Sequence, residues 1–344
     1  MKTVLFTVLM FGVIINLHEL GHFMFAKLFD VRVNEFSFGM GPKLYSKQKN
    51  ETMYSIRLFP IGGYVAMDGE DGETEETKAL DGRAFCDKKP WQRFIILFAG
   101  AAMNIILGFI IILVLTFQMK IIGTNQVLKV EEASPVASYI ETNDKILKVN
   151  GHRTPSYNDV VFQLLRDEDG IIDIVVLRDN QKQAIDGVPF ELEEAENGMQ
   201  MVKLDMVFLG VEHGFFQSID YAFNWTVSII KQVWFSLVDI VTGRYGLKEL
   251  SGPVGTVEVV GKASKIGWSS LFSLFAFITL NVGVFNLLPV PALDGGRLFF
   301  LIIEMLRGKP IPQKYEAYVH ATGLVLLLGL IGIITIKDVI FLFK

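Results

Sequence analysis

Four long apolar segments constrain the fold of this chain more than any other feature of its sequence. Hydrophobic residues make up 51% of the chain and charged residues only 20%, and the mean hydropathy is +0.40, which is too apolar for an ordinary soluble protein. Each segment is close to the roughly 20 residues that a helix needs to cross a bilayer. We therefore predict a polytopic α-helical membrane protein with about four transmembrane helices, over Val4 to Phe25, Phe94 to Phe117, Leu271 to Pro289 and Gly323 to Phe343.

The first segment contains the string HELGH, residues 18 to 22, at a membrane depth where titratable groups are costly and usually have a role. On a helix, the histidines of an H-E-x-x-H pattern lie on one face, about 6 Å apart along the axis, and can reach one zinc ion. Glu19 lies beside the first histidine and can deprotonate a water that zinc activates. The alternative, a pair of structural histidines, is weaker in an apolar span because His and Glu there need partners.

A zinc site needs a third protein ligand, and Asp294 is the strongest candidate. It follows Pro289 and Pro291, which break the helix and can let the carboxylate turn toward a cavity. A helix-capping role for Asp294 is the alternative. The remaining histidines are weaker candidates, because they belong to the predicted outer domain or begin the last span: His152, His213 and His320.

The stretch from Met53 to Met67 alternates in polarity like a pair of strands and contains Gly62-Gly63. We predict a β-hairpin that turns at this dipeptide. The edge of such a hairpin could accept an extended peptide as an added strand.

The orientation in the membrane follows from two short linkers, one before the second span and one after the third. They must share one side of the membrane, because two spans separate them. Both carry Lys and Arg, which favours the cytoplasmic side when loops are short. The larger region between the second and third spans, and both termini, would then lie outside. The net charge of −5 gives no reason to expect nucleic acid as a partner.

The region between the second and third spans is long enough for a folded domain. Lys129 to Asn180 reads as strand, short helix, strand, turn, helix and strand, with the turn at Asn150-Gly151. This order resembles a bacterial PDZ domain. Asn143 stands where such domains usually have glycine, and asparagine tolerates the left-handed backbone that the turn needs.

Ile219 to Val241 is apolar at helical spacing and could be a fifth span. Asp220, Lys231 and Asp239 interrupt it, and a fifth crossing would place Asp294 on the opposite side of the membrane from HELGH. We therefore predict an amphipathic helix that lies on the membrane surface.

Two strings in different spans, HELGH and NLLPVPALDGG, resemble the site-2 protease family of intramembrane zinc metalloproteases. The resemblance covers nearly the whole chain, although Ala101 stands where the family usually has proline. Four further strings are similar to family patterns: the glycine loop FSFGMGPKL (36–44), the membrane-entering hairpin FPIGGYVAM, the entry to the second span AFCDKKPWQRFIILFAGAAMN (84–104), and LSGPVGTVEV (250–259).

The resemblance implies a zinc metalloendopeptidase in which His18, His22 and Asp294 hold Zn²⁺ and Glu19 is the general base. It would hydrolyse peptide bonds within or near transmembrane segments of single-span substrates that another protease has shortened, such as anti-sigma factors or remnant signal peptides. The protein would be a multi-pass protein of the inner or plasma membrane, in contact with lipid, with its active site toward the cytoplasm and its PDZ-like domain outside.

Asn281 and Asn286 match family asparagines near the active site. Each amide could donate to the oxyanion or hold the substrate backbone, or could instead hydrogen-bond between helices. Both interpretations remain open. Asn104, in the second span, is expected to pack against or support the site.

The expected organisation places the protease core in residues 1–118 and 269–344, the PDZ-like domain in 119–212, and the amphipathic connection in 213–268. Two other function classes are alternatives to this prediction: a membrane protein that binds or transports metal, and an inactive scaffold that presents the PDZ-like domain. A transporter would not need Glu19 beside a ligand, and a scaffold would not need the complete set of four groups.

Overall fold

The computed structural model describes residues 2–70, 82–194, 200–244 and 252–342. The chain separates into two compact units, one of residues 1–111 with 236–344 and one of residues 112–235. The boundaries predicted at 118, 212 and 268 remain predictions. The acidic sequence DGEDGETEETK, residues 68–78, predicts a solvated loop, and its residues from 71 onward lie outside the described residues. The first two residues of the LSGPVGTVEV string also lie outside them.

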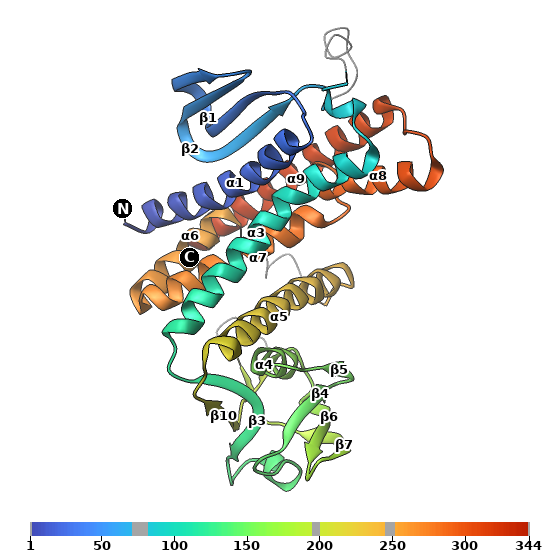
Figure 1. The fold of residues 1–344 in the computed structure, drawn as a ribbon. Helices are drawn as coiled ribbons and strands as arrows, with labels where there is room; N and C mark the ends of the chain where they lie inside the picture. Colours follow the sequence, from blue (N-terminus) through green and yellow to red (C-terminus); the bar gives the residue numbers. More distant parts are fainter. Residues whose placement is uncertain (1, 71–81, 195–199, 245–251, 343–344) are drawn as a thin grey trace. The chain divides into compact units, whose positions relative to one another are not determined.

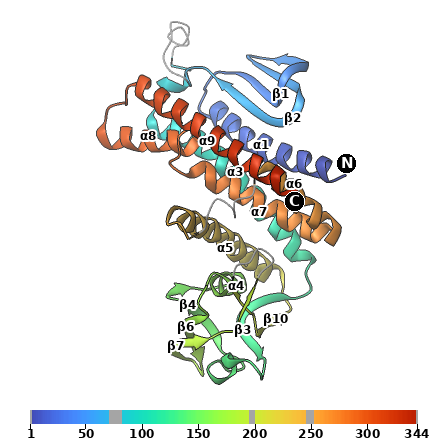
Figure 2. The same cartoon turned by 180° about the vertical axis from the view of Figure 1, so that it is seen from behind.

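Helices long and apolar enough to cross a membrane dominate the first unit, and four are found in the described part of the chain. They run beside one another, together with the shorter helices of this unit (Figures 1 and 2). The four are α1 (Lys2–Leu28), α3 (Pro90–Gln118), α7 (Trp268–Leu287) and α9 (Gln313–Leu342), and the shorter elements are η1 (Phe85–Asp87), α6 (Pro253–Ile266) and α8 (Asp294–Arg307).

Helix α6 is tied to the last span by a carboxylate. Asp338 of α9 is buried, and its Oδ2 accepts the backbone N–H groups of Gly252 and Gly255 at 2.8 and 2.9 Å. These amides belong to the first turn of α6, where N–H groups have no partner within their own helix. An aspartate from α9 therefore caps α6.

The strand pair of the first unit differs from the predicted hairpin. Strand β1 (Val33–Lys49) pairs with β2 (Thr52–Met67), and the chain turns at Asn50, whose φ is 53°. The predicted change of direction near Gly62-Gly63 is present: Gly62 has φ 96°, and the two parts of β2 on either side of it run in opposite directions along β1. The predicted pairing of these two parts with each other was wrong, because β1 residues lie between them. The segment expected to be a glycine loop, residues 36–44, lies within β1.

The β1–β2 sheet is folded so that the start of β1 lies between two parts of β2. Glu35 is opposite both Met53 and Ala66. Residues 63–67 therefore pair with β1 along one side only, within the part of the chain that the structure describes. This segment, 63–67, is called the edge segment below.

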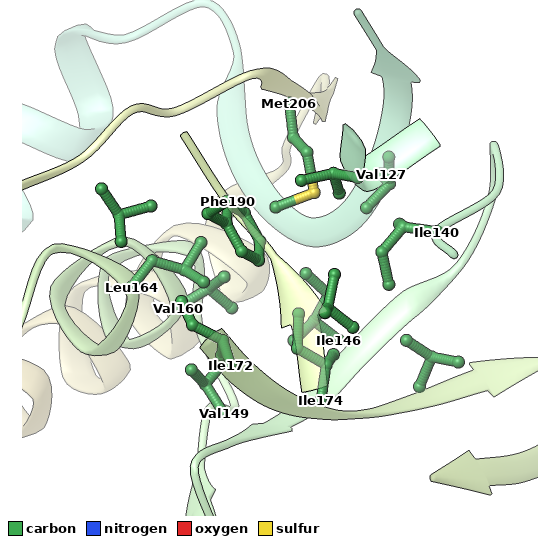
Figure 3. Close-up of a cluster of buried hydrophobic side chains, with 14 residues drawn as sticks. Val127, Ile140, Ile146, Val149, Val160, Leu164, Ile172, Ile174, Phe190 and Met206 are labelled. Atoms are coloured by element: carbon green, nitrogen blue, oxygen red, sulfur yellow. The ribbon is translucent and has the colours of Figure 1, made fainter. Parts of the chain in front are cut away.

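The second unit is built on a six-stranded sheet of order β10-β3-β4-β6-β7, with β5 paired to β4. Figure 3 shows side chains of α4 and of the sheet meeting in its core, among them Val160, Leu164 and Ile172. Its elements are β3 (Ile122–Val130), η2 (Pro135–Ser138), β4 (Lys145–Val149), β5 (His152–Arg153), α4 (Tyr157–Leu165), β6 (Ile171–Arg178), β7 (Gln181–Pro189), β8 (Leu192–Glu194), β9 (Gln200–Val202), β10 (Met206–Val211) and α5 (Phe215–Val241).

The element order predicted for Lys129 to Asn180 is confirmed. The turn residues Asn150 and Gly151 have φ values of 46° and 77°, which suit a tight hairpin. Asn143 has φ 74°, the left-handed backbone predicted for it. Short polar residues can thus replace glycine at such a position.

Helix α5 includes the segment predicted to lie on the membrane surface, and it is not among the four candidate spans of the described residues. Within the second unit, Ala222, Ile229 and Val233 are buried, whereas Phe216 and Phe223 are 82% and 59% exposed. The helix is therefore apolar on a face that its own unit leaves uncovered.

Candidate metal centre

The two histidines of α1 point at one place. His18 and His22 are four residues apart on a regular helix, so their side chains share a face. Both are buried, their Nε2 atoms are 3.0 Å apart, and their rings meet edge to face at an interplanar angle of 85°. The Nε2 atoms of both histidines therefore face the same point beside α1.

Asp294 completes this spot from α8. Helix α7 ends at Leu287, the chain crosses the proline-containing segment, and Asp294 begins α8. Its Oδ2 lies 3.0 Å from His18 Nε2 and 3.3 Å from His22 Nε2. Asp294 therefore lies next to both histidines of HELGH, as the sequence predicts.

The three residues fit a bound divalent ion. Their ligand atoms all lie within 4.8 Å of one another. Asp294 Oδ2 is buried and accepts no well-aligned hydrogen bond from the described residues, as expected for an oxygen whose partner is a cation. Zinc–ligand bonds of about 2.0–2.1 Å in tetrahedral geometry place donor atoms about 3.3 Å apart, close to the spacing here.

Neighbouring groups fix the two imidazole rings. His22 Nδ1 lies 2.8 Å from the carbonyl oxygen of Ile96 in α3. Because a carbonyl can only accept, Nδ1 carries the proton and Nε2 presents its lone pair to the centre. His18 Nδ1 lies 3.5 Å from Asn286 Nδ2. Rotating the amide by 180° exchanges its nitrogen and oxygen, and the oxygen would then accept a hydrogen bond from His18 Nδ1 in the same way.

Gly100 of α3 makes room for the rings, a role that sequence analysis missed. A Cβ at this position would overlap Nε2 and Cε1 of His22 and would lie 2.8 Å from His18 Cε1. Only glycine therefore lets α3 approach the ligand face of α1 this closely. The one signal in the sequence was the run of small residues AGAA at 99–102, which permits close helix packing in membranes.

Glu19 lies at the edge segment of the strand pair. A Cβ on Gly63 would be 3.4 Å from Glu19 Cγ and 3.1 Å from Asn16 Oδ1. Asn16 Nδ2 also lies 3.5 Å from the carbonyl oxygen of Gly62. Glu19, the candidate base, is thus next to His18 in the sequence and lies close to Gly63 of the edge segment.

The two asparagines of α7 have different surroundings. Asn286 contacts His18, as described. Asn281 is half-buried and donates to the carbonyl oxygen of Phe277 in its own helix at 2.7 Å. In α3, Asn104 is fully buried, and neither its Nδ2 nor its Oδ1 has a hydrogen-bond partner in the described part of the chain.

The other three histidines do not join the cluster found among the described residues. The His152 ring packs against the Phe235 ring, with centroids 4.9 Å apart. His213 Nε2 donates to the carbonyl oxygen of Met119 at 2.9 Å. His320 Nδ1 accepts the backbone N–H of Ala292 at 3.0 Å.

Comparison with known proteins agrees with this site. Residues 6–330 match the model of peptidase family M50. The chain is 37% identical to a Clostridium perfringens protein whose name contains the words zinc metalloprotease, over 98% of both chains. It is 30% identical to zinc metalloprotease RasP of Bacillus licheniformis, over 98% of this chain and 99% of that one, and 30% identical to regulator of sigma-W protease RasP of Bacillus subtilis, over 98% of both.

A solved PDZ domain of an SdrC-like protein from Listeria monocytogenes matches 25% of this chain and 88% of its own, at 15% identity and a TM-score of 0.21. A score this low does not establish a shared fold.

A histidine pair with a neighbouring glutamate and an aspartate from a second helix, held among membrane helices, defines an intramembrane metalloprotease. The chain belongs to peptidase family M50, the site-2 protease family that its sequence strings resemble. It is a multi-pass membrane zinc metalloprotease, and its cofactor is Zn²⁺.

Proposed function

We propose that His18, His22 and Asp294 are the zinc ligands and that Glu19 is the general base of this protease. The observation that carries the proposal is the convergence of three ligand atoms within 4.8 Å, with Glu19 next to the first ligand. Zinc held there would lower the pKa of a bound water to about 7 and polarise the scissile carbonyl. Glu19 would take the proton of the attacking water and pass it to the leaving amine.

The substrate would bind as an extended strand along the edge segment. A transmembrane helix hides its amides in its own hydrogen bonds, so it must unwind before it can be cleaved. The edge segment offers backbone groups on its free side, and Gly63 lies beside Glu19. Strand addition there would bring an unwound peptide next to the base.

Proline substitution tests this binding mode. Backbone N–H groups alternate between the two sides of a strand, so one of Val65→Pro and Ala66→Pro removes an outward N–H and the other removes a bond to β1. The outward variant should lower cleavage while zinc content stays at the wild-type level. Unchanged cleavage in both variants would contradict strand addition.

The short linkers before α3 and after α7 would lie in the cytoplasm, and the second unit outside. Basic residues in short loops support this orientation.

The second unit would act as a PDZ-like filter for substrates that another protease has shortened, and the exposed apolar face of α5 would rest on lipid. The substrates would be single-span membrane proteins. Since one relative is named regulator of sigma-W protease, anti-sigma factors are the first to test, followed by remnant signal peptides.

The decisive experiment is cleavage of a single-span reporter by purified protein, wild type against Glu19→Gln, with zinc counted in both. The proposal expects equal zinc and loss of cleavage in Glu19→Gln. Cleavage that survives in Glu19→Gln would remove Glu19 as the base. Zinc without cleavage in the wild type, on any reporter, would favour a metal-binding or scaffold protein instead.

A further inference from the structure

The turn before Asp294 has a backbone that its sequence does not favour. The carbonyl oxygen of Val290 accepts the N–H of Leu293 at 3.2 Å, which closes a four-residue turn with Pro291 in second place and Ala292 in third. Ala292 has φ 73°. A positive φ in third place after proline defines a type II turn, where glycine or asparagine is the usual residue.

A Pro-Ala pair would otherwise fit a type I turn, in which the third residue has a negative φ. The two turn types differ in the peptide group between the second and third residues. From type I to type II, ψ of the second residue changes from about −30° to about +120°, and φ of the third from about −90° to about +80°. The N–H of Ala292 therefore points to opposite sides in the two forms.

His320 of α9 supplies an acceptor for that N–H in the observed form. Its Nδ1 lies 3.0 Å from the backbone nitrogen of Ala292. As an acceptor, Nδ1 carries no proton, so the neutral ring has its proton on Nε2. A peptide flip at Ala292 would forfeit this bond and leave an amide without a partner.

The ring of His320 is itself held in place. Its centroid lies 5.9 Å from that of Phe300, and a Cβ on Gly296 would be 3.1 Å from its Cε1. One helix turn further along α9, a Cβ on Gly323 would overlap Pro291 Cβ, so the α9 backbone packs directly on the turn. Helix α9 therefore contacts the turn through both His320 and Gly323.

We propose that His320 is a positioning residue for the zinc ligand Asp294: it selects the type II turn at Pro291-Ala292 and thereby aims the carboxylate at His18 and His22. Asp294 is two residues beyond Ala292 and begins α8, so a flipped turn would enter α8 differently and displace the carboxylate. This inference rests on the proposed ligation of zinc by Asp294. It gives a role to a histidine that the sequence analysis set aside as a weaker zinc-ligand candidate.

The test compares zinc retention and cleavage in substitutions at residues 320 and 292. His320→Leu removes the acceptor, whereas His320→Asn places an oxygen where Nδ1 was. Zinc retention is measured as the apparent dissociation constant in competition with a chelator. We expect His320→Leu to weaken zinc binding by about 10- to 100-fold, the range for loss of a group that orients a ligand, and His320→Asn to stay within about threefold of wild type.

A second substitution isolates the turn from general packing. Ala292→Gly removes the penalty on positive φ, so the loss caused by His320→Leu should be several-fold smaller in the Ala292→Gly background than in wild type. A merely structural role of the ring would give the same loss in both backgrounds. Thr335→Val is the control on α9 and should match wild type, because the Thr335 hydroxyl donates to the carbonyl oxygen of Ile331 in its own helix.

The inference is overturned if folded His320→Leu holds zinc as well as Thr335→Val, or if Ala292→Gly leaves its loss unchanged. If His320→Leu does not fold, His320→Asn is compared with His320→Gln, which carries its oxygen at the Nε2 position. Equal zinc affinity of these two variants would overturn the inference. A wild-type protein without zinc would instead refute the proposed ligand set.

Discussion

Asp294 Oδ2 lies 3.0 Å from His18 Nε2, although the two residues belong to helices near opposite ends of the chain. Neither half of the protein can form this centre alone. The contact requires α1 to carry both histidines on one face and the break after α7 to present a carboxylate to them. The predictions below follow from the groups around this contact.

Gly100→Ala should reduce zinc content strongly, because the added methyl group would overlap the imidazole ring of His22. Either the ring must leave its place or α3 must move away from α1, and both change the ligand positions. Zinc per protein, measured on purified samples, checks this. Gly329→Ala is the matched control, since a Cβ there meets no atom within 4 Å. Equal zinc in the two variants would contradict the close approach of the helices.

Asn286→Leu should weaken zinc binding by about 10- to 100-fold, as expected when a ligand loses the group that orients it. Asn281→Leu should leave zinc content unchanged, because its side chain bonds its own helix. Chelator competition on both variants measures the difference. If Asn286→Leu keeps full zinc affinity but cleaves poorly, its amide acts on the substrate or the oxyanion instead.

The strand pair should depend on the charge of Glu35. Burial raises the pKa of this carboxyl, but hydrogen bonds outweigh burial and lower the pKa to about 2. The groups that donate these bonds are Ser55, Arg57, Tyr64 and Lys43. Because the pKa in the folded protein is below the ordinary value of 4.5, the carboxylate stabilises the sheet above about pH 4.5, and this contribution is lost as the pH falls toward 2.

Glu35→Gln should therefore speed hydrogen exchange in β1 and β2 at pH 7, and the difference from wild type should shrink at pH 3. Hydrogen exchange followed by mass spectrometry at the two pH values gives the comparison, with variant and wild type always measured at the same pH. A difference that grows toward pH 3 would contradict the direction of the pKa shift.

The proposed orientation predicts which residues an impermeant maleimide can reach. In a Cys86→Ser background, Lys182→Cys in the second unit should react in intact spheroplasts, and Lys89→Cys before α3 should react only after lysis. Both lysines are exposed in the structure. The reverse pattern would place the linkers outside and overturn the proposed orientation.

Much of the site could be predicted from the sequence because its signals are local. The spacing of His18 and His22 defines a helix face, and two prolines before Asp294 mark a break in an apolar span. Apolar length alone gave the four spans. These signals do not depend on knowing what each segment packs against.

Local signals could not predict the pairing of β1 with β2 or the roles of Gly100 and His320. The glycines at 39 and 41 resemble a loop and both have positive φ, yet strand β1 continues on either side of them and pairs with β2. The roles of Gly100 and His320 exist only through contacts with other helices, α1 for the first and the turn before α8 for the second. Tertiary contacts of this kind leave no periodic pattern in a single sequence.

The most direct test of the zinc centre is X-ray absorption at the zinc edge of the purified wild-type protein. We expect one zinc per chain with two imidazole nitrogens and oxygen donors at about 2.0–2.2 Å, and loss of this spectrum in Asp294→Ala. A spectrum with sulfur from Cys86, or with a third imidazole, would contradict the proposed ligand set, as would a spectrum unchanged in Asp294→Ala.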